Sequence, residues 1–424
     1  MNKVLTIILL LPAAVKGYSQ FTLTGEIRPR IEFRDGYKTL LSDDQKPALV
    51  TTQRSRLNLI YKDDRLSFRF SLQDSRTWGE TPAATDASTM NIFEAWAEWF
   101  ISPEFSLKAG RQELAFDNNR LFGTRNWNNL GNSHDMLLLQ YSGKVGLHAG
   151  FAYNNDKAKN YESNYPVDFY KTLVVLRGEK DFGKYLNASA AFINDGFQKE
   201  DSDDTIYYRN TYGGNLSFGN DSVRTGLYGA FYYQSGKSQE GQSIKAYFAS
   251  LNLSYDISPA VNASLAIDYA SGDNALKPDN HKNSFNNLYG NGHSYYGYMD
   301  YFSKLDEDTE GSGLIDIYAR ITSNFGKKSS GEFTYHYFRL ANNAIDSLSS
   351  PGNLLKADRG LGSEIDLLFK NKPAKNIEIN IGYSMMFASP TMELIKGGNH
   401  KKFQQWAYVM LLFKPEFYSS NKQK

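Results

Sequence analysis

Arginine and glutamate recur at every second position near the start of the chain, a spacing that could bind anions. Residues 21–36, FTLTGEIRPRIEFRDG, are charged or hydroxylic at most even positions, including Glu26, Arg28 and Arg30, and apolar at most odd ones. A guanidinium is a permanent cation whose planar fork fits a carboxylate through two hydrogen bonds. Arginines gathered on one wall could therefore hold the carboxylates of an anionic substrate.

Period-two alternation of this kind predicts β-strands, and it continues to the end of the chain. Residues 65–73, RLSFRFSLQ, and residues 261–269, VNASLAIDY, each place apolar side chains on one face and mostly polar ones on the other. About 18 segments of roughly ten residues follow this pattern, whereas helical spacing of apolar residues is hard to find. A soluble sandwich would explain the alternation as a wet face and a core face.

The lengths of the connections favour a membrane barrel over a sandwich. Long connections at residues 36–50, 77–90 and 117–133 alternate with short ones at residues 62–64 and 102–104. Outer-membrane barrels have short periplasmic turns and longer extracellular loops, whereas a sandwich has no reason to sort its loops by length. We therefore expect an all-β fold over residues 20–418, a transmembrane antiparallel β-barrel of about 18 strands with short periplasmic turns and long extracellular loops.

The two ends of the chain predict its destination. Residues 1–19 combine Lys3, an apolar run and small residues, the layout of a secretory signal peptide. The apolar run is too short to span a bilayer as a helix. Residues 419–424 form a polar C-terminal tail. We expect the mature chain in the outer membrane of a Gram-negative bacterium.

Composition excludes several classes of function. The chain has 47 basic and 46 acidic residues, so its global charge identifies no partner and offers no net basic face for nucleic acid. Cysteine is absent, which rules out a disulfide framework and a lipid-modified cysteine. Aromatic residues reach 14%, with 29 tyrosines, a ring type suited to the boundary between water and lipid.

The parity of the apolar residues predicts which charged side chains face the lumen. A bulge at Pro29 is expected because proline cannot donate to a strand ladder, and a bulge at Gly110 would turn Arg111 and Glu113 inward. The predicted pore-lining and substrate-binding residues are Arg28, Arg30, Arg54, Arg56, Arg69, Arg111, Arg320, Glu94, Glu98, Glu113 and Asp268. These charges could brace a wet wall in opposite pairs, or the arginines could bind a passing anion.

Two stretches resemble the alginate export family. They are residues 110–135, GRQELAFDNNRLFGTRNWNNLGNSHD, and residues 265–302, which begin LAIDYASGD and end FNNLYGNGHSYYGYMDYF. The resemblance implies an 18-stranded barrel that passes alginate or related solutes. It also implies pore roles for Arg111, Glu113 and Asp268, a marked turn at 271–273, and loop-organising roles for Arg125, Asn126, Trp127, His134 and Asp135. Family exporters have a long gating turn on the periplasmic side, whereas every such turn expected here is short, so uptake is as open as export.

We therefore expect a passive channel for anionic saccharides such as polyuronates, with no enzymatic activity. The outer-membrane lipid and periplasmic export or uptake proteins are the other expected partners. The alternative is a barrel-borne enzyme or surface adhesin with a plugged lumen, for which His134 and Asp135 could form half of a hydrolytic dyad. No cofactor is expected, although oxygens of residues 271–280 could hold a structural Ca²⁺ in the loop 270–312.

Overall fold

The computed structural model describes residues 19–81, 89–161, 164–199, 205–220, 222–346, 348–350 and 353–420. Residues 1–18 of the expected signal peptide and residues 421–424 of the expected tail lie outside these ranges. Among the described residues, no helix is both long and apolar enough to cross a membrane.

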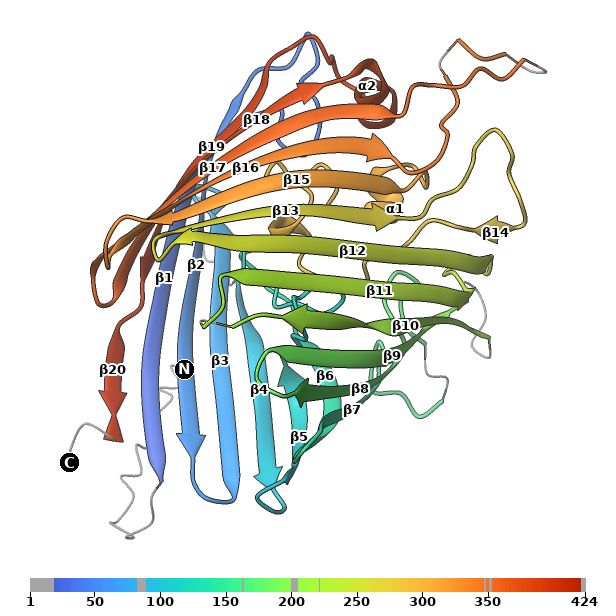
Figure 1. Ribbon diagram of the computed structural model, residues 1–424. Coiled ribbons are helices and arrows are strands. Elements are labelled where there is room, and N and C mark those ends of the chain that lie inside the picture. The colour runs from blue at the N-terminus through green and yellow to red at the C-terminus, as the bar shows by residue number, and fades with distance from the viewer. Residues whose placement is uncertain are drawn as a thin grey trace, which may run out of the picture.

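Eighteen long strands form the wall of one closed antiparallel barrel, as the alternation predicted (Figure 1). The first half of the wall comprises β1 (Gln20–Asp35), β2 (Ala48–Lys62), β3 (Leu66–Thr77), β4 (Met90–Phe100), β5 (Phe105–Gln112), β6 (His134–Ser142), β7 (Gly146–Tyr153), β8 (Thr172–Phe182) and β9 (Leu186–Gln198). The second half comprises β10 (Ile206–Phe218), β11 (Thr225–Lys237), β12 (Ser243–Ser258), β13 (Val261–Ala270), β15 (Leu314–Asn324), β16 (Ser329–Leu340), β17 (Gly360–Ala374), β18 (Ile377–Ala388) and β19 (Gln404–Phe413). β1 pairs with β19 and closes the sheet.

Short elements complete the fold at the two ends of the barrel. The end with the long connections carries β14 (His281–Lys282), η1 (Gly292–Ser294), α1 (Leu305–Asp308) and α2 (Pro390–Lys396). β20 (Glu416–Ser419) lies at the opposite end, where it pairs with β1 (Figure 1). We call these the long-loop end and the short-turn end. Connections at the short-turn end are brief, for example residues 63–65 between β2 and β3.

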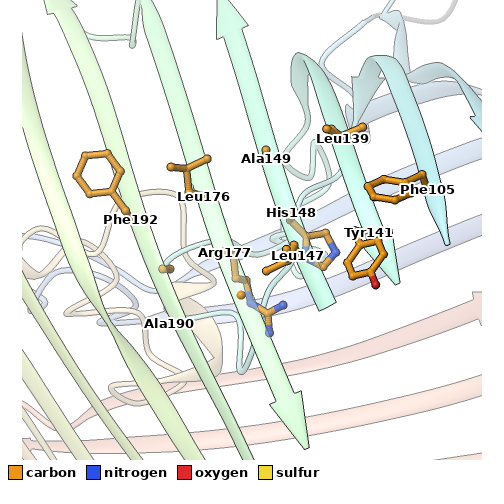
Figure 2. Close-up of a pocket in the computed structure, with 12 residues that line it drawn as sticks. Phe105, Leu139, Tyr141, Leu147, His148, Ala149, Leu176, Arg177, Ala190 and Phe192 are labelled. Atoms are coloured by element: carbon orange, nitrogen blue, oxygen red, sulfur yellow. The ribbon is translucent and has the colours of Figure 1, made fainter. Parts of the chain in front are cut away.

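Side chains alternate across the wall because successive residues of a strand point to opposite faces. On β6, Leu137 and Leu139 face outward and are about half exposed, whereas Met136 and Leu138 face inward and are buried. The outward face is apolar around the barrel. Between β5 and β9 it holds a shallow hollow of about 560 Å³, where Ala149 and Ala190 leave space between larger side chains such as Phe105 and Phe192 (Figure 2).

The strand register corrects both expected bulges. The ladder between β1 and β19 is interrupted at Arg28 and Pro29, where proline has no N–H to donate, and then resumes in the same register. Pairing across Gly110 is likewise continuous. The irregularity lies instead at Phe93 in β4, where the register with β3 shifts. Phe93 and Glu94 are both buried, so this extra residue places two consecutive side chains inside the barrel.

Two long connections fold into the lumen instead of standing outside it. We call residues 113–133, between β5 and β6, inner loop A, and residues 271–313, between β13 and β15, inner loop B. They touch through an isolated backbone bridge between Phe122 and Tyr289. Their apolar side chains join inward residues of the wall in one buried core, for example Phe122 of loop A and Phe285 and Met299 of loop B.

The two halves of the interior differ in how tightly they are filled. Inward residues near the long-loop end, such as Phe248 and Leu340, are buried by the inner loops. Inward residues near the short-turn end, such as Asn252, Ser254 and Ser264, are polar and only partly buried. The barrel is therefore a wet vestibule on the short-turn side that ends at a floor made by the inner loops.

Candidate functional site: the lumen arginines and the inner loops

The arginines of β1 and β2 face the lumen, and inner loop A lies directly on them. Arg28 donates to the carbonyls of Asn126, Trp127 and Asn128, the last at 2.9 Å. Arg30 donates to the Trp127 carbonyl at 3.0 Å. Arg54 reaches the Asn126 side-chain oxygen at 2.8 Å. These guanidiniums thus hold three consecutive residues of the loop, and they are not free on an open wall as the sequence had suggested.

Trp127 is fixed by its ring as well as by its carbonyl. The guanidinium carbon of Arg30 lies 4.0 Å from the indole centroid. The ring of His293, from inner loop B, stacks on the indole with centroids 4.0 Å apart. Trp406 and Tyr408 of β19 meet it edge-on. Trp127 therefore joins both inner loops to the strands that close the barrel.

The arginines differ in whether a carboxylate balances their charge. Arg54 pairs with Glu26 at 2.5 Å, and Arg30 pairs with Glu32 at 3.0 Å. Neither Arg28 nor Arg56 forms an ion pair with any described residue, although both side chains are largely buried. The Arg28 Nε and Arg56 Nη2 atoms also lack hydrogen-bond partners within the described ranges. These two cations have no ion-pair partner among the described residues, although Glu26 acts on both of them, and Glu94 and Glu113 act on Arg56, at longer range.

Arg56 is held without any carboxylate contact. Its Nε donates to the Gln73 side chain at 2.6 Å, and its guanidinium carbon lies 3.6 Å from the centroid of the Phe93 ring. The bulge at Phe93 thus supplies an aromatic face beneath the cation. The Nη2 atom of Arg56 has no hydrogen-bond partner among the described residues and is buried beside Gly131 of inner loop A.

The other predicted lining residues bind neighbouring side chains of the wall or of inner loop A. Arg69 pairs with Glu94 at 2.7 Å. Arg320 lies 3.5 Å from Glu332. Asp268 pairs with Arg120 of inner loop A at 2.7 Å. Glu98 accepts hydrogen bonds from Ser106 at 2.7 Å and Gln140 at 2.8 Å. These contacts correspond to the bracing arrangement considered from the sequence.

The expected inward orientation of Arg111 is wrong. Arg111 pairs with Asp135 across β5 and β6 at 2.8 Å, and both lie on the outward parity of Leu137 and Leu139. Because the strand register is continuous at Gly110, nothing reverses the direction of the Arg111 side chain. Arg111 is therefore not part of the lumen wall.

Glu113 follows the end of β5 as the first residue of inner loop A and lies among the lumen charges. Burial and the nearby Glu94 carboxylate raise the pKa of Glu113 above its ordinary value. Arg56 and Arg69 act in the opposite direction on the same pKa. The change of parity after Gly110 thus marks a loop that enters the barrel, not a bulge within a strand.

His134 and Asp135 lie on opposite faces of β6, so they do not form a dyad. His134 is buried, with Nδ1 2.9 Å from the Tyr170 hydroxyl, while Asp135 binds Arg111. In inner loop B, the Asp273 carboxylate accepts a hydrogen bond from the Asn283 backbone N–H. Across the described ranges, no group of three or more metal-ligating side chains gathers. The calcium site remains an expectation.

Sequence reasoning did not find the partners of the arginines. The carbonyls of residues 126–128 carry no side-chain signal, and His293 lies far away in the sequence. The family resemblance did assign loop-organising roles to Arg125 and Trp127. In the structure Arg125 donates to the carbonyls of Gly290 and Leu288, and so links the two inner loops.

The sequence of this barrel matches one known protein family. The family model described as alginate export matches residues 19–158 and 203–394, most of the chain. The chain belongs to the alginate export family. No curated protein sequence matches this family member.

Solved structures share the fold of this alginate export family member at low identity. The outer membrane protein OprD from Pseudomonas aeruginosa is 16% identical, with a TM-score of 0.61 and 95% of each chain covered. OccK9 (OpdG) from Pseudomonas aeruginosa is 12% identical, with a TM-score of 0.62 and 94% of this chain and 98% of that chain covered. OccAB4 from Acinetobacter baumannii is 11% identical, with a TM-score of 0.61 and coverage of 95% and 99%.

Together the family and the fold assign the protein to the outer membrane of a Gram-negative bacterium, with a channel role. The outward apolar face is then the lipid-facing band. The long-loop end faces the outside of the cell and the short-turn end faces the periplasm.

Proposed function

We propose that this channel passes anionic saccharides, such as polyuronates, and that Arg28 and Arg56 bind the carboxylates of the sugar. The observation that carries the proposal is the charge of these two side chains, which no described carboxylate balances by an ion pair. A buried cation without a counter-ion is costly, and a carboxylate satisfies a guanidinium better than neutral groups do. An anion arriving from the vestibule would supply the missing partner.

The carbonyls on Arg28 define what an anion would have to replace. Both Nη atoms of Arg28 already donate to neutral oxygens of residues 126–129 in inner loop A. A carboxylate brings a full negative charge and is the stronger acceptor, so it would compete with these neutral oxygens for the guanidinium. The direction of transport stays open in this proposal. Periplasmic export or uptake proteins remain expected partners.

The test uses Arg56, because its one hydrogen bond goes to the wall residue Gln73, so its removal leaves the bonds of Arg28, Arg30 and Arg54 to inner loop A in place. Arg56→Gln should weaken block of single-channel current by oligogalacturonate about tenfold, which corresponds to the loss of one charged hydrogen bond. Block by neutral maltohexaose should stay unchanged. Raising the salt to 1 M should weaken block by the uronate in the native channel, because the screening length falls to about 3 Å.

The matched control is Arg69→Gln. It removes the same charge from the neighbouring strand, but from a guanidinium that already pairs with Glu94. We expect a smaller effect of this variant on uronate block. Equal effects of the two substitutions would show that only net charge matters, and intact uronate block in Arg56→Gln would contradict the proposal.

The inner loops favour one second candidate, a barrel with an obstructed lumen that presents its loops as an adhesin or an enzyme. The loops bury the inward side chains of the outer half, such as Phe248 and Leu340. The same bilayer recording separates the two candidates. A native protein that inserts and passes no current would favour the obstructed barrel.

A further inference from the structure

A second cavity opens among the strand ends on the extracellular side, away from the arginines of β1 and β2. We call this cavity of about 480 Å³ the outer pocket. Its wall combines the ends of β5, β6 and β9 to β12 with both inner loops and with residues 154, 165 and 168–170 of the connection between β7 and β8. Its volume falls within the range of small-molecule sites.

Most cations on the wall of the outer pocket lie close to a carboxylate. Arg209 pairs with Asp195 at 2.5 Å, and Lys304 pairs with Glu307 at 2.8 Å. Lys282 lies 3.6 Å from Asp306. Arg125 also lines the pocket and donates to the backbone carbonyls of Gly290 and Leu288. The pocket therefore differs from the Arg28 and Arg56 site, since most of its cations have a carboxylate partner. Its electrostatics suit a polar ligand without charge.

Aromatic rings supply the apolar part of the wall. Tyr165, Phe169 and Tyr170 come from the connection 154–171, and Tyr289 comes from inner loop B. Tyr170 and Tyr289 meet edge to face with centroids 5.3 Å apart. Phe169 is 62% exposed, so a flat ring stands open at the mouth. The C–H face of a sugar ring packs on such aromatic faces, whose negative π-clouds attract it.

Two side chains on the same wall have unsatisfied hydrogen-bonding atoms. Ser284 is 2% exposed and Asp306 is 8% exposed. Within the described part of the chain, Ser284 Oγ and one carboxylate oxygen of Asp306 lack a partner. Buried polar atoms are almost always bonded to protein, water or a ligand. The first can donate and the second can accept, which matches the dual capacity of a hydroxyl group.

We propose that the outer pocket is a saccharide-binding site that recognises hydroxyl groups and the apolar face of an uncharged sugar ring. It would act from the extracellular side, separately from the arginines that are proposed to bind carboxylates. The two sites differ in chemistry, since one offers cations without an ion-pair partner and the other offers aromatic rings among charges that are mostly paired.

The experiment measures binding by calorimetry on the full-length native protein in a detergent without a sugar headgroup. The probes are maltohexaose, cellohexaose and mannohexaose. We expect at least one to bind, and we expect Tyr165→Ala with Phe169→Ala to weaken that binding about tenfold. Tyr161→Ala is the matched control, because Tyr161 is an exposed aromatic residue of the same connection that does not line the pocket.

Two further comparisons make the outcome decisive. Arg56→Gln should leave binding of the neutral hexasaccharides unchanged, so failure of the carboxylate site and failure of the outer pocket can be told apart. Ser284→Ala, a small change in a buried wall residue, should weaken binding without altering the fold. Absence of binding by all three probes, or an equal loss in the Tyr161→Ala control, would overturn the proposal.

Discussion

Trp127 should determine whether inner loop A stays docked in the lumen. Its indole makes one stacked contact with His293, two edge contacts with Trp406 and Tyr408, and one contact with the Arg30 guanidinium. Aromatic pairs contribute about 0.5–1.5 kcal/mol each, and a cation–π contact contributes from about 0.5 kcal/mol when exposed to about 2 kcal/mol when desolvated, as for the buried Arg30. Because neighbouring contacts are not additive and the ring is only half-buried, we expect Trp127→Ala to cost about 2–3 kcal/mol of docking free energy.

A loss of that size would shift the ratio of docked to undocked loop by about 30- to 150-fold. The wall does not depend on Trp127, so the barrel should remain closed while the loop is released. We expect a larger single-channel conductance in a planar bilayer. We also expect faster tryptic cleavage after Arg120 and Arg125, which lie in inner loop A.

Trp78→Ala is the control for this experiment. Trp78 follows β3 at the long-loop end, is 56% exposed and donates its indole N–H to the Gln53 side chain of β2. It should change neither the conductance nor the cleavage pattern. If Trp127→Ala leaves both unchanged as well, the ring contacts are not what holds the loop, and the reasoning fails.

Two other predictions concern the wall and the lumen charge. Ile267→Lys should destabilise the barrel by about 2–4 kcal/mol in lipid unfolding experiments, because Ile267 faces the bilayer, whereas Ser264→Lys on the wet face should cost much less; equal costs would argue against the assigned faces. The pKa of Glu113 is raised in the folded protein, so protonation of Glu113 favours the folded state. This stabilisation is present below the pKa of Glu113 in the unfolded chain and is lost as the pH rises through its pKa in the folded protein. Glu113→Gln should therefore raise the unfolding midpoint at pH 7 and change it little at pH 4, measured by loss of heat-resistant mobility in gels; the same shift at both pH values would exclude titration as the cause.

The wall of the barrel could be predicted from the sequence because the alternation of apolar and polar residues is set within each strand. A strand with one face in lipid and one in water must alternate, and outward residues such as Phe68 and Ile267 follow that rule. The strand number, the closure and the short periplasmic turns were all confirmed.

The lumen could not be predicted in the same way, because it is built by contacts between distant segments without a period. The sequence shows the hydrogen-bond donors of Arg28, but it does not show that they bind backbone carbonyls 98 to 100 residues away. Leu114 and Phe116 shift the apolar parity after Gly110 because inner loop A packs inside the barrel, and this shift was the reason for expecting a bulge at Gly110. That single error produced the wrong bulge and the wrong direction for Arg111.

The seam at β1 sets the order in which the barrel can be completed. β1 pairs with β2, with β19 and with β20, and the Phe21 N–H reaches the Ser420 hydroxyl at 3.0 Å across 399 residues. Contacts between the first and last strands carry the largest loop-closure entropy and form late. Until β19 pairs with it, β1 is an edge strand whose free N–H and C=O groups can pair with another chain. The inner loops contact both strands of this seam: the arginines of β1 bind inner loop A, and Trp406 of β19 meets Trp127 and His293. The inner loops can therefore make all their contacts only when β1 and β19 have paired.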